Sequence, residues 1–124
     1  MTNITVQIED DNDLTIFTVE GNITADEVLK YASEYYEKFP TKNVIWDGTN
    51  GSVKNISANE FKQIAFSIKN KIGKRAGGKT ALVGKFDVDY GSARMYEVYA
   101  LAENIPVSYK AFRDIKDAVL WLKS

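Results

Sequence analysis

The chain has 124 residues, with 16 basic and 17 acidic side chains and with neither histidine nor cysteine. This length can bury the core of one domain and is too short for two, so we expect a single domain over residues 1–124. Without cysteine there is no disulfide, thiolate nucleophile or zinc–thiolate site. Without histidine there is no Ser-His-Asp triad, imidazole base or imidazole metal ligand. We therefore expect a non-enzymatic protein with no cofactor and no metal.

The net charge of -1 hides an asymmetry along the chain. Residues 1–60 carry 4 basic and 11 acidic groups, whereas residues 61–124 carry 12 and 6. Such a split suits nucleic acid or an acidic partner. No long block of like charge occurs, which favours interleaved elements that mix the charges in space and no nucleic-acid partner.

The sequence predicts no targeting signal. The start has no basic segment followed by an apolar run, and no apolar stretch approaches the roughly 20 residues that span a bilayer. We expect no membrane span and a cytoplasmic protein.

The first elements are an expected hairpin and a helix. Residues 4–8 and 14–19 alternate apolar and polar side chains, as strands with one buried face do, and the acidic stretch 9–13 between them favours a turn. Residues 24–27, Thr-Ala-Asp-Glu, form a capping box that begins a helix ending before Pro40. The expected inward stripe of this helix is Val28, Ala32, Tyr35 and Phe39.

The middle of the chain predicts a strand, a loop and a second helix. Residues 43–47 are short and apolar, as in a buried strand, and residues 48–52 (Gly-Thr-Asn-Gly-Ser) indicate a loop. A second capping box at residues 57–60 begins a helix whose apolar stripe runs to Ile72, and Gly73 is expected to end it.

The last third predicts two further strands, each followed by a helix. Residues 79–83 and 105–112 are the strands. A helix is expected from about Tyr90 or Gly91 to Glu103, and Asp114 is expected to cap the last helix. The expected inward residues of the first of these helices are Met95, Val98, Tyr99 and Ala102.

The resulting order of elements is ββαβαβαβα. After the opening hairpin each strand is followed by a helix and another strand, which favours right-handed crossovers. We predict an α/β fold with a five-stranded, mostly parallel mixed sheet and four helices.

Three strings within these elements carry a resemblance to a known family. They are Val-Ile-Trp-Asp at residues 44–47, Asp-Tyr-Gly-Ser-Ala-Arg-Met-Tyr-Glu at residues 89–97, and residues 107–122, where a strand ending in Phe-Arg-Asp precedes Ala-Val-Leu-Trp-Leu. Over nearly its whole length the chain resembles the small bacterial STAS/SpoIIAA-like domains, of the sulphate-transporter and anti-sigma-factor-antagonist type. The resemblance implies a SpoIIAA-like (STAS/SEC14-like) fold and a module that binds a protein or a small ligand.

The resemblance also directs attention to the segment after the third strand. Regulatory members of the wider group carry a phosphorylatable Ser or Thr there, in a short Asp-Ser-Ser/Thr-Gly stretch. In this chain residues 48–57 read Gly-Thr-Asn-Gly-Ser-Val-Lys-Asn-Ile-Ser, which is longer and lacks that motif.

Residues 73–80, Gly-Lys-Arg-Ala-Gly-Gly-Lys-Thr, match the phosphate-loop pattern G-x-x-x-x-G-K-[ST] letter by letter. That loop needs a strand before it and a helix after it, so that backbone amides and the helix dipole converge on phosphate. Here a helix is expected before and a strand after. This order favours a glycine-rich connection, with phosphate or nucleotide binding as the alternative.

Acidic side chains follow the third and fourth predicted strands. Asp47, Asp87 and Asp89 lie at strand ends, where open α/β sheets bind ligands, so they are candidates to converge on a ligand or on Mg²⁺ or Ca²⁺. With Lys85 they are also the candidates for a small carboxylate- or lysine-based enzyme. The competing interpretation is that each aspartate accepts amide hydrogen bonds in a turn or caps a helix.

Arg94 and Tyr90 lie in the first turns of the third predicted helix. A cation gains nothing from the positive end of a helix, so the guanidinium needs another partner. An ion pair with a carboxylate such as Asp47 or Asp87 is favoured, and binding of an anion or a lipid headgroup is the alternative.

Ser57 and the tyrosines complete the candidates. Ser57 begins a helix, where it either caps the first turn or accepts a phosphate. Tyr36 and Tyr96 either belong to the core or project outward as an interface or as the wall of a lipophilic site.

The ligand or partner-binding candidates are therefore Asp47, Ser57, Asp87, Tyr90, Arg94 and Tyr96. The partner remains open at this point between another protein, a second copy of the chain, and a small lipophilic or anionic ligand.

Overall fold

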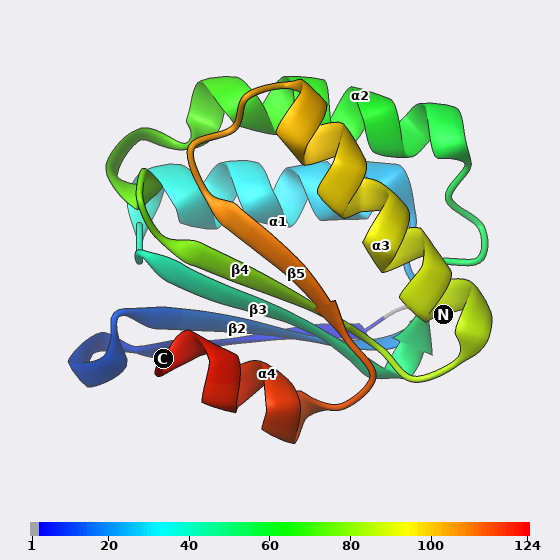
Figure 1. The fold of residues 1–124 in the computed structure, drawn as a ribbon, viewed down its shortest axis with the longest axis horizontal. Helices are drawn as coiled ribbons and strands as arrows, with labels where there is room; N and C mark the ends of the chain where they lie inside the picture. The colour runs from blue at the N-terminus through cyan, green and yellow to red at the C-terminus, as the bar shows by residue number, and fades with distance from the viewer. Residues whose placement is uncertain (1–2) are drawn as a thin grey trace.

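The computed structural model of the chain describes residues 3–124, so the first two residues of the expected range 1–124 lie outside the described part. It contains one five-stranded sheet with helices on both faces (Figure 1). The strands are β1 Asn3–Glu9, β2 Leu14–Asn22, β3 Asn43–Ser52, β4 Lys79–Gly84 and β5 Ser108–Phe112. The α-helices are α1 Ala25–Lys38, α2 Ala58–Ile68, α3 Asp87–Ala102 and α4 Ile115–Leu122. Short 3-10 helices cover Asp10–Asn12, Lys69–Lys71 and Gly73–Arg75.

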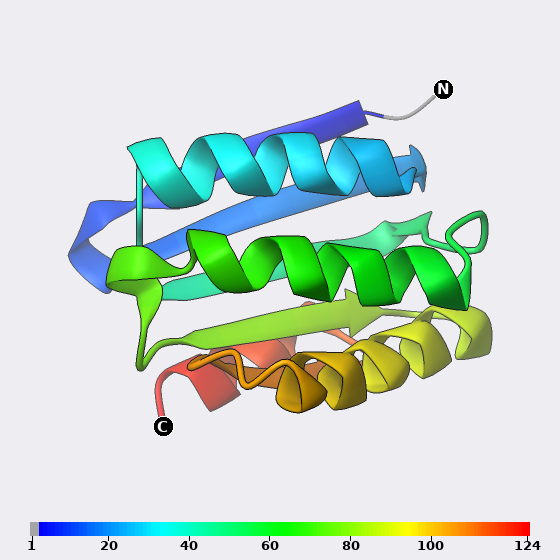
Figure 2. The same cartoon turned by 90° about the horizontal axis from the view of Figure 1, so that it is seen from above.

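The strands lie in the sheet in the same order as in the chain, β1-β2-β3-β4-β5. β1 and β2 pair antiparallel as a hairpin, and the remaining neighbours pair parallel. Because every crossover moves one strand in the same direction, right-handed connections place α1, α2 and α3 on one face. Figure 2 shows these three helices side by side over the sheet, while α4 covers the opposite face. The predicted element order and the mostly parallel mixed sheet are confirmed.

Each face of the sheet has its own core. Strand side chains alternate between the faces, so Val44 packs beneath α1–α3 with Phe17, while Ile45 packs against α4 with Ala118. All four side chains are fully buried. No helix among residues 3–124 is long and apolar enough to cross a bilayer.

The predicted helix caps are present. Thr24 and Ser57 each form a complete capping box, in which the hydroxyl accepts from the third helical amide and the glutamate accepts from the capping amide. Asp114 accepts a hydrogen bond from the amide of Asp117 at 2.9 Å. These side chains satisfy amides that the first helical turn leaves unpaired.

The predicted loop at residues 48–52 is wrong, because β3 continues through it to Ser52 and pairs with the end of β2. The register shifts by one extra β3 residue between Thr18 and Glu20 of β2, which is a β-bulge. Gly48 stands in the bulge because a Cβ there would lie 2.6 Å from the carbonyl oxygen of Val83 on β4. Glycine at position 48 therefore permits the close approach of the β3 and β4 backbones and does not mark a turn.

Helix α3 begins at Asp87, earlier than predicted, and its inward face differs from the expected one. Its capping residue, Phe86, makes no side-chain hydrogen bond, so no capping side chain marks the start. Val98 is 62% exposed and Ala102 is exposed, whereas Tyr96 and Ala100 face the core.

The inward stripe predicted for α1 also fails at its last member. Phe39 is 51% exposed because it lies past the last helical residue, at the C-cap. Ala32 and Tyr36 are the buried side chains in the later turns of this helix.

Candidate functional site

A cavity of about 110 Å³ lies between the sheet and the helices α1–α3. Its floor comes from β2 to β5 and its roof from the three helices. Protein interiors hold few voids larger than one water molecule, so a cavity of this volume is an unusual feature. Representative lining residues are Val19, Ile64, Ile68, Leu82, Ala93 and Tyr96.

The rings of two tyrosines form the wall at one end of this apolar lining. Tyr96 of α3 and Tyr109 of β5 have ring centroids 5.5 Å apart. Burial is the main cause that raises the pKa of both phenols, and nearby tyrosines add to it. Neither hydroxyl has a hydrogen-bond partner within residues 3–124.

Arg75 lies behind this wall and is 0% exposed. Its Nε donates to the carbonyl oxygen of Thr41 at 3.0 Å, and its Nη2 donates to the Thr80 hydroxyl at 2.6 Å. The guanidinium carbon lies 4.5 Å from the ring centroid of Tyr36, a cation–π contact. It is also close enough to Tyr109 to lower the pKa of that phenol, against the larger effect of burial. Nη1 has no hydrogen-bond partner in the described part of the chain.

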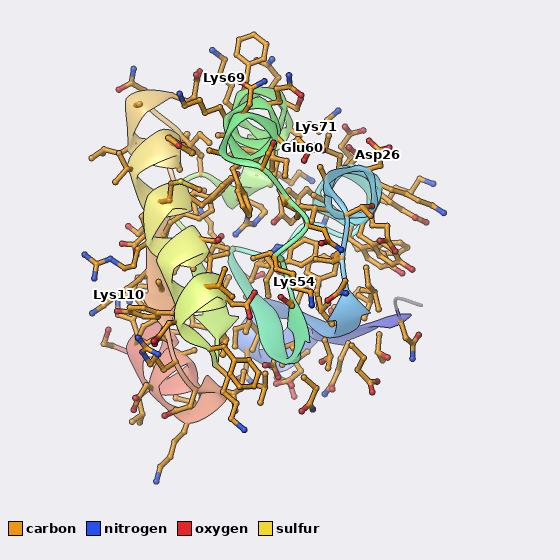
Figure 3. The ribbon with its side chains drawn as sticks, turned by 90° about the vertical axis from the view of Figure 1, so that its right-hand side faces the viewer. Asp26, Lys54, Glu60, Lys69, Lys71 and Lys110 are labelled. Atoms are coloured by element: carbon orange, nitrogen blue, oxygen red, sulfur yellow. The ribbon has the colours of Figure 1, made fainter. Side chains whose placement is uncertain are left out.

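The opposite end of the cavity lies where the parallel strands finish. Asp89, the third residue of α3, is buried there and accepts from the Ser52 hydroxyl and from the Val53 amide, each at 2.8 Å. Figure 3 looks onto this end of the molecule, with Lys54 between the starts of α1 and α3. Since Ser52 and Val53 are only partly buried, the cavity approaches the surface here.

Two predicted site residues have local structural partners. Asp47 accepts from the amide and the hydroxyl of Thr49, at 3.0 and 2.6 Å, and so stabilises the β3 bulge. Ser57 caps α2 by accepting from the Glu60 amide at 3.1 Å. Neither side chain lines the cavity.

The predicted residues at the start of α3 form an exposed group. Asp87 pairs with Arg113 at 2.7 Å, and the guanidinium carbon of Arg113 lies 4.5 Å from the ring centroid of Tyr90. The favoured ion pair of Arg94 with a carboxylate is present, but its partner is Glu97 and not Asp47 or Asp87. Arg94 lies 3.5 Å from the Tyr90 hydroxyl, to which it donates, and 3.4 Å from Glu97. All of these partners except Arg113 lie within α3, one helical turn apart.

The strand-end acids do not converge. No group of three or more acidic side chains able to hold a metal ion exists among residues 3–124. Asp89 points to the cavity end, Asp87 pairs with Arg113, and the ammonium of Lys85 lies 5.8 Å from the ring centroid of Phe86. These partners separate the side chains proposed for a carboxylate- or lysine-based enzyme.

The segment 73–80 has the order of elements that argues against a phosphate loop. α2 and the 3-10 helix Lys69–Lys71 precede the segment, and β4 begins at Lys79, so no helix begins after the glycines. The Lys79 ammonium donates to the carbonyl oxygens of Trp121 and Ser124, and the Thr80 hydroxyl accepts from Arg75. The two residues that would hold phosphate and metal in a phosphate loop are thus bound within the chain.

Two of the residues around this wall were predicted as candidates from the sequence, and two were not. Tyr36 and Tyr96 are buried, so the outward alternative is wrong and both line the cavity. Arg75 and Tyr109 were not among the candidates. Arg75 lies in what the sequence indicates only as a connection, and the excess of tyrosine was the one signal that pointed to this wall.

Comparisons with known proteins place the fold. No protein-family model matches the chain. No curated protein sequence matches it either. In structure the chain is similar to an uncharacterised protein of the DUF3478 family with a SpoIIAA-like fold from Shewanella loihica PV-4. The two share 17% identity with a TM-score of 0.53, over 98% of this chain and 93% of that chain. The chain therefore has a SpoIIAA-like fold, and at this identity the likeness concerns the fold alone.

Proposed function

We propose that the chain is a binding module whose cavity takes a small, largely apolar ligand. The observation that carries this proposal is the cavity of about 110 Å³ beneath α1–α3. Left unfilled, the apolar lining of such a cavity lacks packing contacts, which costs stability. A ligand that fills it recovers the lost packing contacts.

The lining supports a ligand with a substantial apolar part. Ile64 and Ile68 of α2 face Leu82 of β4 across the cavity, and Val19 and Ala93 add further apolar surface. Apolar pockets with a few placed polar groups are the usual form of small-molecule sites. We assign no catalytic role, because the acidic side chains at the strand ends have separate partners.

Benzene is a suitable first probe, because a dry apolar cavity of roughly 150 Å³, somewhat larger than this one, binds it. We expect benzene to raise the melting temperature of the protein and to shift the NMR signals of the Ile64 and Leu82 methyl groups. Ligands that bind only the native state stabilise it by an amount that rises with the logarithm of the ligand concentration above the Kd. The absence of both effects at benzene saturation would overturn the proposal.

A matched pair of substitutions on α3 checks that the cavity is responsible. Ala93→Met places a flexible side chain into the cavity, whereas Ala102→Met adds the same side chain at an exposed position of the same helix. We expect A93M to abolish the benzene effect and A102M to retain it. Equal loss in both variants would place benzene elsewhere and contradict the proposal.

A further inference from the structure

We infer that the ligand of this cavity is a small monocarboxylate, whose charge is compensated by Arg75 and whose oxygens accept from Tyr96 and Tyr109. The inference rests on the proposed function and specifies its ligand class. It follows from three features of the cavity. An uncompensated cation and unused donors lie at one end, and a negative charge lies at the opposite end.

The first feature is a buried positive charge with no negative partner. Arg75 is 0% exposed, and no carboxylate pairs with it among residues 3–124. Its contacts are the carbonyl oxygens of Thr41 and Lys42, the Thr80 hydroxyl and the ring of Tyr36, all of which are neutral. Buried charges in proteins are normally paired, because an isolated charge loses its hydration. The cation therefore favours an anion in the adjoining cavity, where low polarity strengthens the attraction.

The second feature is a cluster of buried polar groups that lie close together without forming a complete hydrogen bond. Arg75 Nη1, the Tyr96 hydroxyl and the Tyr109 hydroxyl are buried without hydrogen-bond partners in the described chain. Tyr96 and Tyr109 both line the cavity, and Arg75 acts on the hydroxyl of Tyr109. A carboxylate supplies two acceptor oxygens and no donor, so it matches this set of groups. Its single negative charge also matches the single guanidinium.

The third feature sets the orientation of the ligand. Thr80 and Tyr109 pair across β4 and β5, and both line the cavity at the end next to Arg75. Asp89 lies at the other end, where β3 finishes. An acid therefore binds with its carboxylate toward Arg75, away from Asp89, and with its apolar part along Leu82.

The volume limits the size of the acid. A cavity of about 110 Å³ is smaller than one of roughly 150 Å³ that holds benzene, so the apolar part is a short branched chain or a small ring. The unused donors expose almost no surface to the cavity or to solvent, so a carboxylate reaches them only through a change in the χ1 rotamer of Tyr109. Binding should therefore change the NMR signals of the Tyr109 ring.

Isobutyrate and isobutyramide test the inference, because the two molecules share one shape and only the first is charged. We expect isobutyrate to bind at least about tenfold more tightly than isobutyramide, because hydrogen bonds to a charged group are stronger than hydrogen bonds to a neutral one. Inorganic phosphate, which carries more charge, is expected not to compete. The readouts are NMR titration of the Tyr109 ring and competition with isobutyrate.

Removing the phenolic donors tests the site without disturbing other hydrogen bonds. In the double variant Tyr96→Phe and Tyr109→Phe we expect isobutyrate affinity to fall about tenfold or more, with benzene binding unchanged. Tyr31→Phe removes a hydroxyl from α1 outside the cavity and should leave both ligands unaffected. Arg75→Met should abolish the preference for isobutyrate, and if that variant fails to fold, the tyrosine variant decides.

The outcomes separate the two proposals. If benzene binds and isobutyrate binds no better than isobutyramide, the carboxylate inference is overturned and the cavity remains a site for neutral ligands. Competition by phosphate at equal affinity also overturns it. If none of the three organic probes binds, the proposed function fails as well.

Discussion

The carboxylate of Asp89 accepts a hydrogen bond from the hydroxyl of Ser52 at 2.8 Å and thereby joins the first turn of α3 to the end of β3. These residues are 37 positions apart in the chain. A second bond from the Val53 amide, also at 2.8 Å, holds the chain as it leaves the sheet. Asp89 thus fixes the end of the cavity that lies opposite Arg75.

We predict that Asp89→Asn lowers the free energy of unfolding by about 1–3 kcal/mol, because a buried, charge-assisted acceptor is replaced by a neutral amide. Urea unfolding followed by circular dichroism measures the change. Asp87→Asn is the matched control, since its side chain is 94% exposed and its ion pair with Arg113 is at the surface. Equal loss in both variants would contradict the role given to Asp89.

Two glycine-to-alanine substitutions should have opposite effects on stability. At Gly48 a Cβ would lie 2.6 Å from the carbonyl oxygen of Val83, so Gly48→Ala must push β3 away from β4 and should cost about 1–3 kcal/mol. At Gly91, within α3, a Cβ meets nothing within 4 Å. Gly91→Ala should stabilise the protein by about 0.5–1 kcal/mol, because alanine favours a helix. Thermal and urea unfolding of both variants check the signs.

The buried phenols predict a loss of stability at high pH. Burial raises the pKa of Tyr96 and Tyr109 above the ordinary value of 10.0. Above pH 10 the unfolded chain releases these protons while the folded chain keeps them, so each tyrosine lowers stability by roughly 1.4 kcal/mol per pH unit. Their contribution is fully present below pH 10 and is lost as the pH rises toward the folded-state values.

Substitution by phenylalanine isolates this contribution from other groups that titrate in the same range. Urea unfolding between pH 9 and pH 11 should show a steep decline for the natural chain. Tyr96→Phe and Tyr109→Phe should each make the decline shallower by about one proton. A slope that neither substitution alters would show that the two phenols titrate alike in the folded and unfolded states.

Most of the fold could be predicted from the sequence, because the local signals for helices and strands agree with the packing. The capping boxes at Thr24 and Ser57 begin α1 and α2 as predicted. The start of α3 could not be predicted from capping, since Phe86 caps it without a side-chain hydrogen bond. The β3 bulge could not be predicted either, because the close contact of Gly48 with β4 exists only in the folded sheet.

The candidate site was predictable only in part. A surplus of tyrosine indicated Tyr36 and Tyr96 as candidates. Whether their side chains point inward or outward depends on packing against α2 and the sheet. Arg75 gives no sequence signal of burial, because it lies among lysines and glycines that favour an exposed connection. Its burial depends on the carbonyls of residues 41 and 42, some 33 positions away along the chain.

The agreement between strand order and chain order has a consequence for assembly during synthesis. Each new strand joins the free edge left by the strand before it, so no earlier pairing has to reopen for an insertion. Folding that proceeds from the first residues onward can therefore extend the sheet one βα unit at a time. The last such addition, β5 with α4, places α4 over the second face of β4 and leaves β5 as the edge strand of the finished sheet.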